Sequence, residues 1–99
     1  MNSKVAKEIF EQCDEVAHLL KSLAHPVRLK VLCCLADGEK RVGQLTEFCS
    51  LEQASMSQFL KRMKDSRLLS SRREGSSIYY RIADDRILKL MKAMKYIFC

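Results

Sequence analysis

The fold is decided by residues 41–82, RVGQLTEFCSLEQASMSQFLKRMKDSRLLSSRREGSSIYYRI. A short apolar helix, a tight turn and a second helix with a polar Ser/Gln face are followed by a basic hairpin. The hairpin has strand-like runs at 68–73 and 77–82, joined by Glu74-Gly75-Ser76, where glycine supplies the positive φ of a tight turn. This order predicts a winged helix-turn-helix, which is typical of proteins that bind double-stranded DNA.

The second helix of this stretch has an apolar face and a polar face, because successive side chains are about 100° apart. Met56, Phe59, Leu60 and Met63 form the apolar face. The remaining positions of this helix carry small residues and amides at its start and cations towards its end. On this polar side we expect DNA contacts from Gln53, Ser55, Ser57, Gln58, Lys61 and Arg62. Gln58 can pair with adenine in a major groove, and Lys61 and Arg62 can meet phosphates. The alternative is a solvated helix face, but such a face usually carries Glu/Lys pairs at i, i+4 spacing.

The hairpin and the charge distribution agree with DNA binding. The tip is basic and slim, so Arg73 and the backbone amides near Gly75 and Ser76 are predicted to contact phosphate. The chain has 18 Lys plus Arg and 12 Asp plus Glu, a net charge of +6. Residues 53–82 contribute seven cations and two carboxylates to this balance, a concentration of positive charge typical of a nucleic-acid face.

The remaining segments are predicted to be helices, in the order α-α-α-α-β-β-α within one domain, residues 1–99. Pro26 begins a second helix that runs to about Ala36, and Ser50 with Gln53 is expected to form a capping box for the DNA-facing helix. Asp84 or Asp85 caps the last helix. The first and last helices have more apolar surface than a small domain covers, so we expect them to form a homodimer interface; the alternative is an intramolecular core.

Other classes of function find little support in the residues. No signal peptide or transmembrane run is visible, so we expect a cytoplasmic protein without membrane contact. No nucleophile–base pair, phosphate loop or metal constellation predicts an enzyme. A winged-helix module that uses its wing for protein contacts is the alternative from another class.

Across nearly its whole length the chain resembles the ArsR/SmtB family of winged-helix repressors. The matching segments are residues 20–29 (LKSLAHPVRL), 42–45 (VGQL) and 53–60, together with Arg72, Glu74-Gly75 and Tyr79-Tyr80 in the wing. The chain departs from the family at Phe59, where a histidine is common, and at Ser76, where a basic residue often follows the wing glycine. The resemblance implies a transcriptional repressor, and the expected homodimer would place two DNA-facing helices about one DNA turn apart on a palindromic operator.

The metal sites that the family uses lack their ligands in this chain. Arg41 and Gly43 stand at the positions of the Cys-x-Cys pair of the arsenic and cadmium sensors. Residues 84–99 contain no histidine, so the zinc and nickel motif of the last helix is missing as well. His25 belongs to the His-Pro junction and is interpreted as structural. We therefore predict no metal and no cofactor.

The five cysteines are Cys13, Cys33, Cys34, Cys49 and Cys99, many for a chain of this length. Free cysteines are commonly small buried hydrophobes. On the second helix, however, Cys33 lies about 40° and Cys34 about 140° from Leu29, so neither is expected in the core. Side chains at i and i+1 diverge, and a Cys33–Cys34 disulfide would require unwinding.

The resemblance suggests a partner for Cys33. In the BigR/SqrR/HlyU-type branch, which responds to persulfide or oxidant, one cysteine stands at the place of Cys33 and another in a Tyr-x-Phe-Cys-like ending. Here that ending is Tyr96-Ile97-Phe98-Cys99. This implies a repressor released when an oxidant or reactive sulfur species modifies a Cys33/Cys99 dithiol. The alternative is a repressor with passive cysteines that responds to a metal at an unrecognised site.

Overall fold

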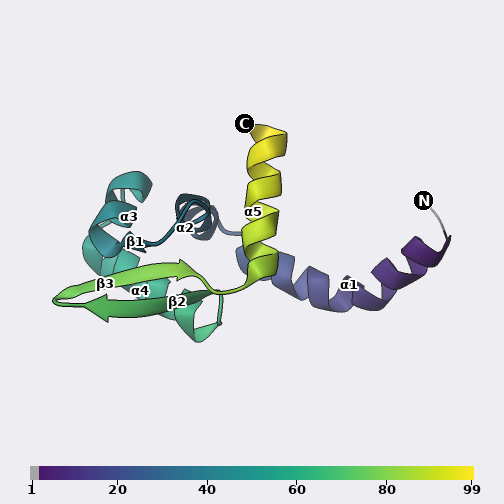
Figure 1. Ribbon diagram of the computed structural model, residues 1–99, viewed down its shortest axis with the longest axis horizontal. Coiled ribbons are helices and arrows are strands. Elements are labelled where there is room, and N and C mark those ends of the chain that lie inside the picture. The colour runs from purple at the N-terminus through teal and green to yellow at the C-terminus, as the bar shows by residue number, and fades with distance from the viewer. Residues whose placement is uncertain (1–2) are drawn as a thin grey trace.

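The computed structural model describes residues 3–99 and contains five helices and three strands (Figure 1). In chain order these are α1 (Ser3–Leu23), α2 (Pro26–Leu35), β1 (Lys40–Arg41), α3 (Val42–Cys49), α4 (Gln53–Asp65), β2 (Leu69–Glu74), β3 (Ser77–Ile82) and α5 (Asp85–Phe98). The elements α3 and α4 followed by the β2–β3 hairpin confirm the predicted winged helix-turn-helix.

The sheet contains one strand more than the sequence predicted. Its order is β1-β3-β2, all antiparallel, with Lys40 opposite Tyr80 and Arg41 opposite Tyr79. The predicted order, with a two-stranded hairpin alone, was wrong on this point. Because β1 pairs with β3, it joins the base of the wing to the start of α3.

The wing ends in a tight turn at Gly75. Glu74 pairs with Ser77, so Gly75 and Ser76 form a two-residue connection instead of the predicted three residues. Gly75 has a φ of 62°, a left-handed conformation that costs a residue with a Cβ about 1–2 kcal/mol. Glycine is therefore favoured at position 75, because it adopts this positive φ without the steric cost of a Cβ.

The helix ends differ from the prediction at α4. Ser50 does not cap α4; it ends α3 with a φ of 51°, and its N–H donates to the carbonyl of Thr46. Glu52 is the residue before α4 and provides no side-chain cap. The expected Ser50/Gln53 capping box was therefore wrong. The predicted cap of the last helix is confirmed, because the Asp84 side chain accepts a hydrogen bond from the N–H of Arg86 at 2.9 Å.

The core lies where α2, α3, α4, the sheet and the first half of α5 meet. Its members are mostly aliphatic and sulfur-containing: Leu23, Val31, Leu32, Leu35, Leu45, Cys49, Met56, Leu60, Met63, Leu68, Leu69, Tyr80, Ile87 and Met91. No helix within residues 3–99 is long and apolar enough to span a bilayer.

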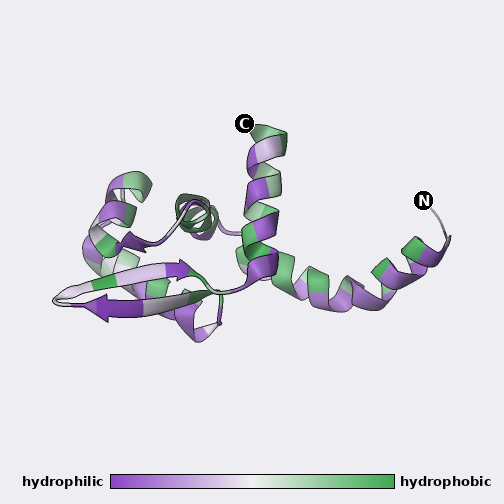
Figure 2. Ribbon diagram, in the orientation of Figure 1, coloured by the Kyte–Doolittle hydropathy of each residue, from purple (hydrophilic) through white to green (hydrophobic). Residues whose placement is uncertain are grey.

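Helix α1 extends away from this core (Figure 1), and only Leu23 is buried among its residues Ser3–Leu23. Its apolar side chains include Ile9, Phe10 and Leu20, all exposed. In Figure 2, green hydrophobic stretches alternate with purple hydrophilic ones along α1. An exposed ion pair, from Arg86 Nη1 to Glu15 Oε1 at 2.7 Å, joins α5 to α1.

Candidate DNA interface and cysteine sites

Helix α4 separates its core face from its polar face as predicted. Met56, Leu60 and Met63 are buried, whereas Phe59 is half-buried. On the opposite side Gln53, Ser57, Gln58, Lys61 and Arg62 are exposed, but Ser55 is half-buried. Five of the six predicted side chains on α4 are therefore freely available to a ligand.

A concavity of about 690 Å³ joins the start of α4 to the wing. Gln53 and Ser57 of α4 and Ser76 of the wing turn line it together. Arg41 and Gln44, at the start of α3, also line it; sequence reasoning did not assign them to the DNA face. The Gln44 side chain accepts the backbone N–H of Arg41 at 2.9 Å, which holds this end of α3 beside the concavity. The exposed charge of Arg41 is the signal that was available in the sequence.

Within the wing, Arg72 is engaged by two carboxylates. Its guanidinium donates to Glu39 at 3.0 Å and to Glu74 at 2.6 Å, and it lies 4.5 Å from the centre of the Tyr79 ring. The hydrogen bond from Arg72 holds the pKa of Glu39 below its usual range. The positive charge of Arg72 is therefore largely compensated within the protein, whereas Arg73 and Gly75 remain exposed at the tip.

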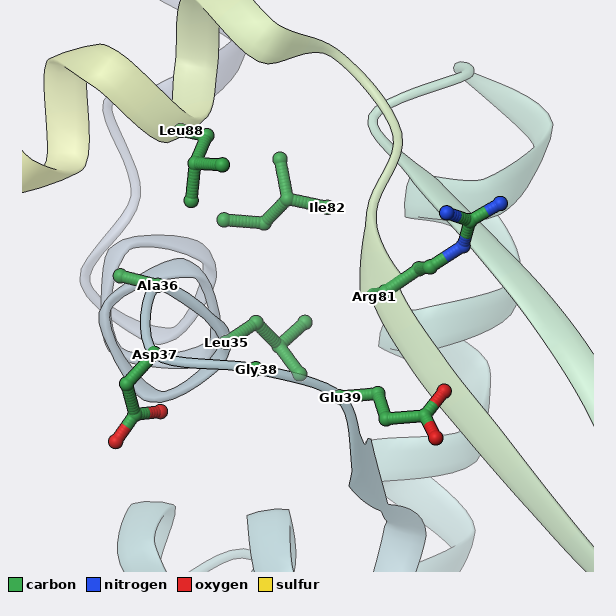
Figure 3. A pocket seen from close by; sticks show the side chains of 8 residues that line it. All are labelled: Leu35, Ala36, Asp37, Gly38, Glu39, Arg81, Ile82 and Leu88. Atoms are coloured by element: carbon green, nitrogen blue, oxygen red, sulfur yellow. The ribbon is translucent and has the colours of Figure 1, made fainter.

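An apolar hollow of about 440 Å³ lies where α2, α5 and β3 meet (Figure 3). Leu35, Ile82 and Leu88 converge on it, and the side chain of Arg81 points away. Glu39, at its edge, is already hydrogen bonded to Arg72. The hollow thus provides packing between elements and no reactive set of groups.

Cys33 of α2 and Cys99 at the end of α5 line the same groove, which has a volume of about 330 Å³. Both cysteines are exposed free thiols. Met91, Met94 and Phe98 form most of the remaining wall. The backbone N–H of Cys99 donates to the carbonyl of Lys95 at 2.9 Å, so the last residue continues the hydrogen-bonding pattern of α5. The structure therefore brings together the two cysteines that the resemblance paired.

The position of Cys34 differs from the one expected from the sequence. Cys34 is half-buried and packs against the core, so the expectation that it lies outside the core was wrong. Burial raises the pKa of the Cys49 thiol, and Lys30 and the Cys34 thiol have smaller, opposite effects on it. Burial, followed by the proximity of Cys49, raises the pKa of the Cys34 thiol.

Metal-ligating side chains do not gather elsewhere in the described chain. Among residues 3–99 there is no group of three or more His, Cys, Asp or Glu side chains that could hold a metal ion. His25 instead caps α2, accepting the N–H of Val27 through Nδ1 at 3.1 Å.

The fold, the exposed polar face of α4 and the adjoining wing define a winged helix-turn-helix DNA-binding protein. Residues 25–71 match the model of the bacterial regulatory protein family named arsR. A biofilm growth-associated repressor of Agrobacterium fabrum is 42% identical over 89 residues, which cover 90% of this chain and 76% of that protein. The chain belongs to the ArsR family of transcriptional regulators, a family of regulators and not of enzymes.

Solved structures show the same architecture. The crystal structure of the transcriptional repressor BigR from Xylella fastidiosa has a TM-score of 0.85 at 36% identity, covering 95% of this chain and 96% of that one. The homodimeric winged helix-turn-helix domain of Mb0332 from Mycobacterium bovis, solved by NMR, has a TM-score of 0.72 at 31% identity. The match covers 98% of this chain and 85% of that fragment.

Proposed function

We propose that this protein is a transcriptional repressor that binds a palindromic operator as a homodimer and is released when its Cys33/Cys99 dithiol is oxidised or persulfidated. Helix α4 enters the major groove, with Gln58 at a base edge and Lys61 and Arg62 at phosphates. The wing places Arg73 and the amides near Gly75 and Ser76 along the adjacent backbone.

The homodimer is supported by the exposed apolar surface of the two terminal helices. In α1, Ile9 and Phe10 are 47% and 76% exposed, and in α5 Ile97 and Phe98 are 67% and 78% exposed. Large apolar side chains left exposed on two helices are typical of an interface. A twofold axis through α1 and α5 would place two α4 helices on successive turns of one face of DNA, which matches a palindromic site. The homodimeric Mb0332 domain supports the same assembly.

The observation that carries the switch is that exposed thiols from α2 and α5 line one groove. A hydroperoxide can take two electrons and two protons from this pair, forming one disulfide and releasing water plus the alcohol, or two waters from hydrogen peroxide. A persulfide can instead transfer its outer sulfur to one cysteine and leave as a thiol; a second persulfide molecule then accepts two electrons and two protons as the cysteine persulfide and the other cysteine form a trisulfide, and it leaves as a thiol and hydrogen sulfide. Either link would tie α5 to α2 and change the dimer contact, so that the two α4 helices no longer match the half-sites. A coupling of about 1–3 kcal/mol, roughly 5- to 150-fold in affinity, is the usual size of such an effect.

The test measures DNA binding by fluorescence anisotropy with reduced and oxidised protein, and identifies the linked peptides by mass spectrometry. Reduced wild type should bind its operator, and peroxide or an organic persulfide should release it. Cys33→Ser and Cys99→Ser should each keep the protein bound under both conditions. The matched controls Cys13→Ser and Cys49→Ser should still respond, and Cys34→Ser identifies which sulfur of α2 is attacked. Full release of both Cys33→Ser and Cys99→Ser by oxidant would contradict the proposal.

A further inference from the structure

We propose that the groove at Cys33 and Cys99 recognises an apolar organic body, so that the dithiol reacts faster with an organic hydroperoxide or persulfide that carries such a body than with a small polar oxidant. This inference rests on the proposed function and names the chemical class of its inducer. Both kinds of oxidant react with the same two thiols, and the experiment below distinguishes them.

The walls of the groove are mainly apolar. Ala36, directly after α2, and Met91, Met94 and Phe98 of α5 line it beside the two thiols. Met91 is buried, Met94 is half-buried and Phe98 is 78% exposed, so the groove runs from the core to the surface. Its volume of about 330 Å³ lies at the lower end of the range for small-molecule sites, about 300–1,000 Å³.

Among the described residues that line the groove, Lys95 alone carries a charge. The hydrogen bond from Lys40, at 2.9 Å, and more weakly the charge of Lys95 hold the pKa of Asp37 below its usual range. Asp37 is thus bonded to Lys40, and the ammonium of Lys95 keeps a positive charge at the groove. A positive charge there favours the alkoxide or thiolate that leaves when an oxidant reacts.

The apolar walls should raise the reaction rate by binding the part of the oxidant that does not react. The hydrophobic effect favours an alkyl or aryl body between the methionine and phenylalanine side chains, which holds its peroxide or persulfide group beside Cys33 and Cys99. Hydrogen peroxide has no apolar surface to bury and gains nothing from these walls. Methionine side chains are flexible and fit irregular shapes, so the groove suits a class of bodies instead of one molecule.

Two other apolar hollows of the chain lack a pair of thiols. The hollow between α2, α5 and β3 (Figure 3) is larger, but no cysteine is among the described residues that line it. The apolar strip of α1 around Val16 contains one thiol, Cys13. Of these three hollows in residues 3–99, the groove alone combines apolar walls with two exposed thiols from different helices.

The reaction with a hydroperoxide, ROOH, balances as follows. The thiolate of one cysteine attacks the terminal peroxide oxygen, which breaks the O–O bond and gives a sulfenic acid. The alkoxide leaves and takes up a proton to become the alcohol, ROH. The second thiol attacks the sulfenic sulfur, forms the S–S bond and displaces water. The two thiols lose two electrons and two protons, whereas an organic persulfide gives the trisulfide described above.

The experiment uses the full-length wild-type protein and two pairs of probes. Hydrogen peroxide is compared with cumene hydroperoxide, and cysteine persulfide, which is polar, with benzyl persulfide. Alkylation and mass spectrometry measure the rate at which the Cys33 and Cys99 peptides become linked. Each rate is divided by that of the same oxidant with free cysteine, which removes differences in intrinsic reactivity. The apolar member of at least one pair should be favoured by about tenfold or more, the effect of removing about two methylene groups from water.

A pair of variants tests the wall of the groove. Met94→Gln places an amide in the wall and should reduce a tenfold preference to about threefold or less. Leu90→Gln is the matched control and should keep the preference, because Leu90 is also half-buried and packs against the core from α5 but does not line the groove. In both variants the rate with the polar probe should stay within about twofold of wild type, since that probe buries no apolar body.

A preference within the hydroperoxide pair or within the persulfide pair supports the inference and identifies the kind of inducer. Equal normalised rates within both pairs, which is also the result if a second copy of the chain covers the groove, would overturn the inference and leave the proposed switch intact. Equal losses of preference in Met94→Gln and Leu90→Gln would overturn it as well. If no probe links Cys33 to Cys99, the proposed function itself fails, and this result is distinct from equal rates.

Discussion

The imidazole of His25 packs against the ring of Phe59, with centroids 5.3 Å apart and planes tilted by 48°. The same imidazole caps α2 by accepting the N–H of Val27. One side chain therefore contacts both the beginning of α2 and α4, the helix that we propose enters the major groove. Phe59 adjoins Gln58 in α4, so this contact helps to set the rotation of α4 about its own axis.

Replacing His25 should separate its two contributions. His25→Ala removes both the cap and the ring contact and should lower the free energy of unfolding by about 1–2 kcal/mol. His25→Asn keeps a capping acceptor and loses only the ring contact, so its free energy of unfolding should fall by less than that of His25→Ala. Urea unfolding of the two variants checks this, and equal losses would show that the cap contributes nothing.

The assigned DNA contacts predict two kinds of mutant. Gln58→Ala should weaken binding to the best operator by about 1–3 kcal/mol and reduce discrimination among sequences. Lys61→Ala or Arg62→Ala should weaken binding to all duplexes and lower the salt slope by about one. Titrations with operator and scrambled DNA at several salt concentrations distinguish the two kinds of mutant. If all three mutants behave identically, the base contact of Gln58 and the phosphate contacts of Lys61 and Arg62 are wrong.

The carboxylate of Glu39 should limit the electrostatic attraction of the wing for DNA. Glu39→Gln removes a charge that compensates Arg72, so binding to any duplex should tighten at low salt and its salt slope should steepen by up to about one. Glu11→Gln, which removes an exposed charge on α1, outside the wing, is the matched control. Equal effects of the two variants would mean that only net charge matters.

Acid stability should depend on Asp84. The hydrogen bond from Arg86 holds the pKa of Asp84 below its usual range, so the folded state prefers the carboxylate. Its contribution is therefore complete above the ordinary carboxyl pKa and is lost as pH falls through the lowered, folded-state pKa. Asp84→Asn should flatten the acid side of the stability profile, and Asp85→Asn should change it less. Urea unfolding from pH 7 to pH 2 provides the comparison.

Metals should not act as inducers. One equivalent of zinc, cadmium, nickel or arsenite should leave the protein on its operator, because both metal motifs of the family lack ligands in this chain. Isothermal titration and an operator-binding assay with each metal test this expectation. One tightly bound metal per protomer, coupled to loss of DNA binding, would refute it.

The helices and the hairpin were predictable because each has a strong local signal. Pro26, the apolar face around Met56 and the turn at Gly75 are examples. The two-residue strand β1 has no such signal, because Lys40 and Arg41 are strand only through pairing with Tyr79 and Tyr80. Ser50 was misassigned for a related reason. Serine is a common N-cap residue, so we expected it to cap α4, but its left-handed backbone conformation ends α3 instead.

The cysteines show the same limit at the level of packing. A helical wheel assumes one buried face, but α2 packs against α3 on one side and has the Cys33 groove with α5 on another. Cys34 is therefore half-buried against the core, although it lies off the apolar face of the wheel. The wheel placed Cys33 at the border of the apolar face, and in the structure its thiol is exposed in the groove beside α5. Long-range neighbours of this kind are not encoded in helical periodicity.

Because α1 buries so little of its surface within its own chain, the folding of this helix should depend on the concentration of the protein in the cell. A helix that buries one side chain in its own chain gains little from folding alone, since packing supplies most helical stability. If a second copy covers α1, its formation becomes bimolecular, and dilution should unwind it. Gene dosage would then set the threshold at which operator occupancy begins, before any oxidant reaches the thiols.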